Sequence, residues 1–119
     1  MRALDRVTRW PVPNGAAAIV TANNGAHPAV FATVGDSSRQ FRLASLSKTI
    51  TGLTALIAAE EGSVSLDEPI DLRASSVTIH DGTTLRHLLA HASGLPFDGA
   101  TPIAGLGRRR IYSNTGIEL

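Results

Sequence analysis

The stretch that decides the fold is residues 45–61, SLSKTITGLTALIAAEE. Apolar side chains recur along it at steps of four, three and four: Leu46, Ile50, Leu53 and Ile57. This spacing places them on one face of an α-helix. Gly62 follows, and glycine often ends a helix because it adopts the left-handed backbone conformation without strain. We therefore predict a helix from about Ser45 to Glu61 with one apolar face directed at a core.

The start of this helix carries a Ser-x-x-Lys pattern. Ser45 and Lys48 are three positions apart, which brings their Cβ atoms within about 5–6 Å on one helix face. Lys48 is the only lysine of the chain, and every other member of its 11 basic residues is arginine. A partly buried lysine can lose its proton and act as a base, whereas arginine stays protonated. The pair predicts a nucleophile with its base; the simpler alternative is a surface lysine on a helix.

A second pattern, Tyr112-Ser113-Asn114, contains the only tyrosine of the chain. A phenol can transfer a proton. The alternative is an ordinary half-buried aromatic with its hydroxyl in water. Ser47, inside the first pattern, is predicted to be a helix hydroxyl rather than a second nucleophile.

Two short runs rich in alanine, valine and isoleucine precede the helix, at residues 16–21 and 29–34. Between them stands Asn23-Asn24-Gly25, whose residues tolerate positive φ, so the runs predict a β-hairpin with a slightly long loop. Residues 41–43 are expected to be a brief extended lead into the helix.

After Gly62 the pattern is more broken. Residues 61–70 predict a loop, and residues 77–80 predict a short strand before an Asp81-Gly82 turn. Thr84 can cap a second helix that runs to about His91, with Gly94 as its stop.

Composition excludes several classes of function. The chain has 119 residues and a net charge of +1, which is enough for one domain and supplies no long-range field to attract nucleic acid. Residues 108–110, three arginines, are predicted to be a solvated turn, so no nucleic-acid partner is expected. The absence of cysteine excludes disulfides and thiol chemistry. The first twenty residues hold no uninterrupted apolar run, so we expect no signal peptide, no membrane span and a cytoplasmic location.

Two other kinds of site were weighed. His87 and His91 are four apart on a predicted helix and could face one metal, but Leu88 stands where a zinc protease carries glutamate, and no third ligand is evident. Ser93 precedes Gly94, yet His91 occupies the place of the first glycine of a Gly-x-Ser-x-Gly elbow. We expect neither a metal nor another cofactor.

Four blocks occur together in one order. They are Phe41-Arg42-Leu43-Ala44-Ser45-Leu46-Ser47-Lys48-Thr49; Glu61-Gly62 with Leu66-Asp67-Glu68-Pro69; Leu85-Arg86-His87-Leu88-Leu89-Ala90-His91-Ala92-Ser93-Gly94-Leu95-Pro96; and Tyr112-Ser113-Asn114-Thr115-Gly116. From about Ala16 to its last residue the sequence resembles the serine β-lactamase and penicillin-binding peptidase superfamily. Within that superfamily it resembles the class C branch, which also holds D-alanyl-D-alanine peptidases and esterases.

The resemblance implies a fold and a set of roles. The fold is an α/β fold of the α+β type, an antiparallel sheet flanked by helices. Ser45 would be the acylated nucleophile, Lys48 and Tyr112 its proton-transfer partners, and Asn114 a hydrogen-bond donor to substrate. Which of Lys48 and Tyr112 takes the first proton stays open.

The resemblance also implies that the domain is partial. Members are considerably longer, and a third motif, Lys-Thr-Gly or His-x-Gly, lies on a later strand. We expect residues 1–119 to form one incomplete domain: an N-terminal hairpin region to about residue 44, the nucleophile helix over 45–62 and a helical region over 63–119. Arg110-Ile111 replaces the more usual aromatic before the tyrosine.

The predicted function is that of a serine hydrolase that forms an acyl-enzyme on an amide or ester. A β-lactam, a D-amino-acid peptide and a small ester are all candidate substrates. The alternative is a catalytically silent remnant, or a module that recognises acyl groups and needs a second chain.

Overall fold

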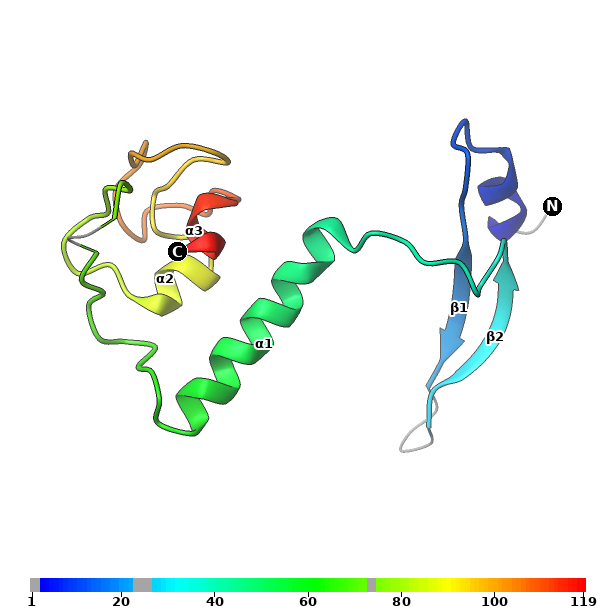
Figure 1. Cartoon of the computed structure of the whole chain (residues 1–119), viewed down its shortest axis with the longest axis horizontal. Coiled ribbons are helices and arrows are strands. Elements are labelled where there is room, and N and C mark those ends of the chain that lie inside the picture. The colour runs from blue at the N-terminus through cyan, green and yellow to red at the C-terminus, as the bar shows by residue number, and fades with distance from the viewer. Residues whose placement is uncertain (1–2, 23–26, 73–74) are drawn as a thin grey trace. The chain divides into compact units, whose positions relative to one another are not determined.

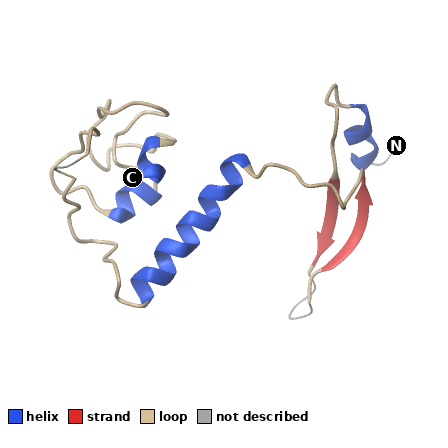
Figure 2. Cartoon of the chain, viewed as in Figure 1, coloured by secondary structure: helices blue, strands red, loops and turns tan. Residues whose placement is uncertain are grey.

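The computed structural model describes residues 3–22, 27–72 and 75–119. The chain forms two compact units, Met1–Arg42 and Leu43–Leu119. The α-helices and β-strands are labelled in Figure 1, and helices and strands are coloured by type in Figure 2. In chain order these are η1 (Ala3–Arg9), β1 (Ala17–Thr21), β2 (Ala29–Val34), η2 (Ala44–Leu46), α1 (Ser47–Glu60), α2 (Leu85–Leu89) and α3 (Thr115–Glu118).

The first unit is the predicted hairpin with a short 3-10 helix beside it. β1 and β2 pair antiparallel, and both strands fall on the predicted runs. The register steps by one between Ile19, which pairs with Ala32, and Val20, which pairs with Val30. Phe31 is therefore the extra residue of a β-bulge, a feature that increases the local twist. The predicted loop at Asn23-Asn24-Gly25 lies outside the described residues.

The 3-10 helix η1 supplies the buried apolar side chain of this unit. Val7 is only 8% exposed. A Cβ placed on Gly15 would meet its Cγ1 at 3.3 Å, so the backbone just before β1 runs directly under η1. This element is not predicted from the sequence, because a single buried valine leaves no periodic pattern.

In the second unit, the predicted helix is α1, preceded by one 3-10 turn. The chain enters through η2 and becomes α-helical at Ser47, two residues after the predicted start. The helix ends as predicted: Gly62 has φ +75°, the N–H of Ser63 donates to the Ala58 carbonyl at 2.8 Å, and the N–H of Gly62 donates to the Ala59 carbonyl at 3.1 Å. These bonds form a Schellman motif, which satisfies carbonyls left free at a helix end.

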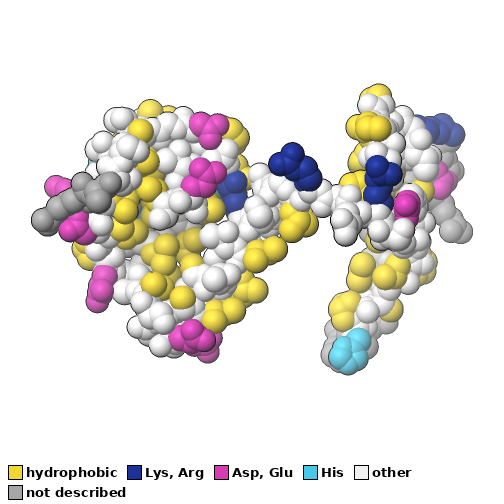
Figure 3. All heavy atoms as spheres, in the orientation of Figure 1, with side chains coloured by type: hydrophobic (Ala, Val, Ile, Leu, Met, Phe, Trp, Pro, Cys, Tyr) yellow, Lys and Arg dark blue, Asp and Glu magenta, His cyan; other side chains and the backbone are white. Residues whose placement is uncertain are grey.

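The expectation that the apolar face of α1 packs into a core is wrong. No residue of α1 is buried. The exposed fractions of its apolar stripe run from 46% to 67% and belong to Leu46, Ile50, Leu53, Leu56 and Ile57. Figure 3 shows hydrophobic side chains gathered along this helix. Across the grooves beside α1 lie only a few apolar side chains, those of Val64, Leu66, Leu85 and Leu89, and these are too few to cover it.

The small core of the second unit lies around α2. Leu88 is 3% exposed and Leu95 is fully buried. The N-cap of α2 is Thr84, as predicted: its hydroxyl accepts the N–H of His87 at 3.3 Å, and Nδ1 of His87 accepts the N–H of Thr84 at 3.2 Å. This reciprocal pair is a capping box in which histidine takes the place of the usual glutamate or glutamine.

The predicted stop of α2 is wrong. The helix ends at Leu89, and the left-handed position after its C-cap is occupied by His91, with φ +58°. Gly94 also has a positive φ, +87°, but it does not end the helix. It lies against the Ala104 carbonyl, with which a Cβ at this position would collide. Glycine at this position allows two backbone segments to approach closely.

The predicted strand at residues 77–80 is also wrong. Among the described residues, β1 and β2 are the only strands, and the N–H of Thr78 donates to the Ala100 carbonyl at 2.7 Å in an irregular segment.

The loop after Gly62 is held to the start of α2 by an ion pair. Arg86 forms a two-pronged ion pair with Asp67, Nε to Oδ1 at 2.7 Å and Nη2 to Oδ2 at 2.8 Å. That hydrogen bonding lowers the pKa of Asp67.

None of the helices in the described ranges is long and apolar enough to cross a membrane.

Candidate active site

Ser45 lies in the 3-10 turn that leads into α1. It is exposed, and the residue before it, Ala44, has φ +45°. The turn is held by Ser47, whose Oγ donates to the Ala44 carbonyl at 2.6 Å. The Ser47 hydroxyl therefore has the structural role predicted for it, and Ser45 is the hydroxyl presented at the start of the helix.

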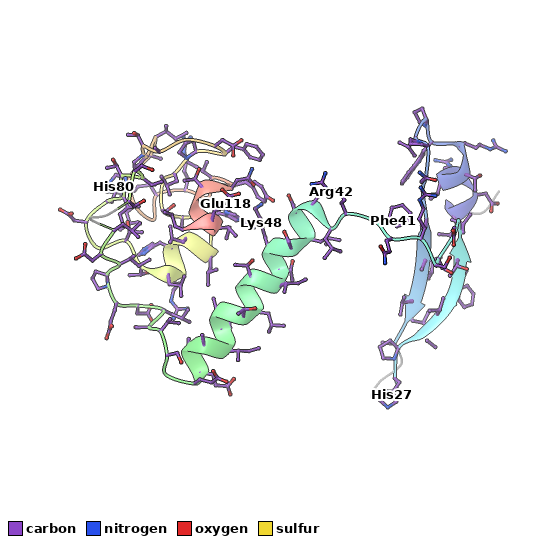
Figure 4. The ribbon with its side chains drawn as sticks, viewed as in Figure 1. His27, Phe41, Arg42, Lys48, His80 and Glu118 are labelled. Atoms are coloured by element: carbon purple, nitrogen blue, oxygen red, sulfur yellow. The ribbon has the colours of Figure 1, made fainter. Side chains whose placement is uncertain are left out.

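Lys48 occupies the first turn of α1 and is half-buried. Its side chain is labelled in Figure 4. Its Nζ lies 5.4 Å from the centroid of the Tyr112 ring. This separation is within the range of a cation–π contact. The structure thus brings together two of the residues singled out from sequence, one from α1 and one from the segment before α3.

The Tyr112 ring lies against two other rings, those of His91 and Phe97. Its centroid lies 4.7 Å from that of His91, with an interplanar angle of 32°, and 5.9 Å from that of Phe97, with an angle of 22°. The residue remains 41% exposed. The ring is therefore packed against its two neighbours while part of it faces solvent.

His91 holds the backbone on both sides of Tyr112. Its carbonyl accepts the N–H of Ile111 at 2.8 Å, and its Nδ1 accepts the N–H of Ser113 at 3.1 Å. His91 is 7% exposed and Ser113 only 1%. The Ser113 hydroxyl in turn accepts the N–H of Gly116 at 2.9 Å at the start of α3.

Burial lowers the pKa of His91, and the positive charges of Arg110 and Lys48 lower it further. All three effects disfavour the imidazolium. Because Nδ1 accepts a backbone N–H, the neutral ring carries its proton on Nε2.

Asn114 is fixed from the other side by the segment after the buried core. Its backbone N–H donates to the Phe97 carbonyl at 2.7 Å, and its Nδ2 donates to Asp98 Oδ1 at 3.0 Å. The N–H of Gly99 donates to the Thr115 hydroxyl at 3.2 Å. One N–H of the Asn114 amide is therefore taken by Asp98, and the second is left for another acceptor.

The structure adds residues that sequence reasoning did not select. From the sequence, His91 is predicted only as a helix end and is a poorly supported metal ligand, and no role is predicted for Phe97 or Asp98. The sequence does hold one indication of a role for His91: a histidine stands at a helix end, where glycine is favoured. It holds none for Asp98, because its partner Asn114 is distant in sequence.

The two histidines once weighed as metal ligands are engaged elsewhere. Nδ1 of His87 belongs to the capping box, and Nδ1 of His91 accepts from Ser113. In the part of the chain that the structure describes, no three histidine, aspartate or glutamate side chains are grouped so as to hold a metal.

Comparison with known proteins bears on the whole chain. A sequence model of the beta-lactamase family matches residues 11–119. Over 56 residues, 47% of this chain, the sequence is 41% identical to penicillin-binding protein 4* of Bacillus subtilis (strain 168) and covers 12% of that protein. A crystal structure of a beta-lactamase from Mycobacterium bovis superposes with a TM-score of 0.72 and 43% identity, over 97% of this chain and 38% of that one.

The chain thus spans 12% and 38% of the lengths of these two relatives. The likeness to a solved beta-lactamase confirms the predicted fold class, helices with an antiparallel sheet, and the predicted resemblance to the serine β-lactamase and penicillin-binding superfamily. Because the family match extends over nearly all of its residues, the chain belongs to the beta-lactamase family.

Proposed function

We propose that this chain carries the acylation site of a serine hydrolase of the class C type, with Ser45 as its nucleophile. The substrate is an amide or ester: a β-lactam, a D-amino-acid peptide or a small ester. Lys48 follows Ser45 by about one helical turn. The observation that carries the proposal is that Lys48 Nζ lies 5.4 Å from the centroid of the Tyr112 ring. A nucleophile near two groups that can exchange a proton is the arrangement that acyl transfer requires.

The proposed reaction begins when Ser45 Oγ attacks the substrate carbonyl carbon. Its proton passes to the amine of Lys48, or to a Tyr112 phenolate stabilised by the Lys48 ammonium, and both routes fit the contact between the two side chains. The tetrahedral intermediate then collapses, the C–N or C–O bond breaks, and the leaving group takes up the proton. Water hydrolyses the resulting ester on Ser45 and regenerates the enzyme.

Two groups would bind the substrate. The backbone N–H of Ser45, at the N-terminal end of a helix, would donate to the developing oxyanion, where the helix dipole would add stabilisation. Asn114 would donate the amide N–H that Asp98 leaves free to a carbonyl of the substrate. Because Asp98 Oδ1 accepts one N–H of the Asn114 amide, the amide is held in one orientation and its second N–H points in one fixed direction.

Backbone strain supports this location. Ala44 and His91 are the non-glycine residues with positive φ in the described ranges. Ala44 directly precedes Ser45, and His91 packs against the Tyr112 ring. Strain of this kind, about 1–3 kcal/mol per residue, persists where the surrounding structure requires it and is concentrated at functional sites.

The second candidate is an acyl-recognition module, or a silent remnant, that needs a second chain. The exposed apolar stripe of α1 favours it, since an uncovered face of this size is typical of a surface that contacts more protein. In that case Ser45 would be acylated only when the stripe is covered.

The test is acylation of the chain by a fluorophosphonate and by a fluorescent penicillin, followed as mass gain on the intact protein. We expect one adduct on Ser45, abolished in Ser45→Ala and retained in the control Thr49→Ala, which removes an exposed hydroxyl four residues away. An adduct that still formed in Ser45→Ala would show that another residue is the nucleophile. Absence of any adduct, with labelling restored by a purified relative supplied as a second chain, would favour the module.

A further inference from the structure

We propose that His91 is a positioning residue for Tyr112: as a neutral imidazole it holds the backbone on both sides of the tyrosine and packs against its ring at a tilt. That His91 assists catalysis rests on the proposed function. That His91 holds Tyr112 in place does not depend on it. Nothing in the proposed acyl transfer requires His91 to touch substrate.

The backbone at His91 is the first argument. After α2 the N–H of Ala92 donates to the His87 carbonyl at 2.8 Å, and the N–H of His91 to the Leu88 carbonyl at 2.9 Å. These bonds form a Schellman motif with His91 at its left-handed residue, φ +58°. Glycine would occupy this position without strain, so a histidine here indicates that its side chain is needed.

The side chain and carbonyl of His91 form the second argument. The N–H groups of Ile111 and Ser113, the two neighbours of Tyr112, both donate to this one residue, at 2.8 and 3.1 Å. The ring lies 4.7 Å from the Tyr112 ring between centroids. Three contacts from one buried residue therefore limit both the backbone and the side chain of Tyr112.

The protonation state is the third argument. Only a neutral ring can accept at Nδ1, because imidazolium is a donor at both nitrogens. The charged and titratable groups around it are Lys48 of α1 and Arg110 and Tyr112 of the facing segment; α2 itself carries Arg86 and His87. Lys48 and Arg110, together with burial, keep the ring neutral and the bond to Ser113 intact.

Two variants separate these features. His91→Gly suits the left-handed backbone but removes ring and acceptor, whereas His91→Asn tolerates that backbone and places Oδ1 where Nδ1 was. Tyr112 is the only tyrosine of the chain, so a single set of ring resonances in NMR reports its position without any need for activity. We expect the Tyr112 resonances to move in His91→Gly and to return toward their wild-type positions in His91→Asn.

Acylation of Ser45, measured as the rate of adduct formation on folded protein, is the second readout. We expect His91→Gly to slow it by on the order of 10²-fold, as a small misplacement of a reacting group does, and His91→Asn to restore it to within about tenfold of wild type. A purely structural role would instead change stability in both variants without this pattern of rescue.

The outcomes remain distinguishable. Unchanged Tyr112 resonances in His91→Gly, or His91→Gly acylation at the wild-type rate, would overturn the assignment of His91. Failure of the wild-type chain to be acylated at Ser45 would count against the proposed function alone, and the NMR comparison of the two variants would still decide whether His91 positions Tyr112.

Discussion

The ammonium of Lys48 lies 5.4 Å from the centre of the Tyr112 ring, although the two residues belong to α1 and to the segment before α3. A cation in this position is attracted to the ring face by about 0.5–2 kcal/mol. The contact therefore links the start of α1, where Ser45 lies, to the Tyr-Ser-Asn segment. It is the point at which the two sequence motifs become one candidate site.

Tyr112→Phe separates chemistry from packing. The phenylalanine ring keeps its packing against His91 and Phe97 and its contact with Lys48, and only the hydroxyl is removed. We expect Ser45 acylation to slow by on the order of 10²-fold, the usual effect of losing a proton-transfer group, while the free energy of unfolding changes by less than about 0.5 kcal/mol. An unchanged acylation rate would remove Tyr112 from the proposed mechanism.

Asp98→Ala tests how Asn114 is oriented. The change removes the acceptor of the Asn114 amide, which can then rotate. We expect weaker binding of the acylating reagent, by up to about tenfold, with little change in the rate at saturation. The matched control is Thr115→Val, which removes the bond to the Gly99 N–H and leaves Asn114 as it is. Equal effects in both variants would argue that this segment is merely stabilised as a whole.

Stability should fall in acid partly because of His91. Its folded pKa is lowered from 6.5, so below that pH the unfolded chain takes up a proton more readily than the folded one. The contribution of neutral His91 to the free energy of unfolding is fully present above pH 6.5, and it is lost as the pH falls toward the lower pKa of His91 in the folded chain. Urea unfolding across this range should show the decline in wild type and a smaller one in His91→Asn. Identical pH dependence in the two proteins would show that His91 does not contribute.

Two glycines should differ in their response to alanine. Gly62 and Gly94 have φ +75° and +87°, so a side chain strains both by about 1–2 kcal/mol. A Cβ at Gly62 meets nothing within 4 Å, whereas at Gly94 it collides with the Ala104 carbonyl and lies 3.2 Å from His80 Nε2. We expect Gly94→Ala to lower the free energy of unfolding by about 1–3 kcal/mol more than Gly62→Ala. Equal losses, measured by urea unfolding, would mean that the backbone relaxes around Ala104.

The chain alone should behave as a marginal fold and a slow catalyst. The exposed stripe of α1 should bind a dye for apolar surface and promote self-association, and turnover of nitrocefin and p-nitrophenyl esters should be weak. Leu53→Gln combined with Ile57→Gln should reduce dye binding with little loss of stability, since these side chains are 59% and 46% exposed. Sharp cooperative unfolding together with rapid Ser45-dependent hydrolysis would contradict this expectation.

Near-neighbour patterns accounted for much of what was predicted correctly. The two runs rich in alanine, valine and isoleucine, at residues 16–21 and 29–34, marked the hairpin, and the steps between Leu46 and Ile57 marked α1. The Gly62 stop was correct because a Schellman motif depends on a few consecutive residues. Such features are decided within one element, where sequence spacing translates directly into distance.

The errors arose where a distant partner overrides a local preference. Gly94 was predicted to end α2, but His91 takes the left-handed position because its Nδ1 meets the Ser113 N–H. Residues 77–80 have the composition of a strand, yet Thr78 donates to Ala100 instead of to a strand. β-structure depends on its pairing partner more than on intrinsic preference.

By itself, the sequence determined the family, the hairpin and α1, since each follows from residues close together in the chain. The tertiary structure alone decided that Lys48 lies against Tyr112, that His91 holds both neighbours of that tyrosine, and that Asp98 orients Asn114. These contacts join segments that are remote in sequence. Their geometry depends on how the loops between α2 and α3 close and pack, and no local spacing encodes that.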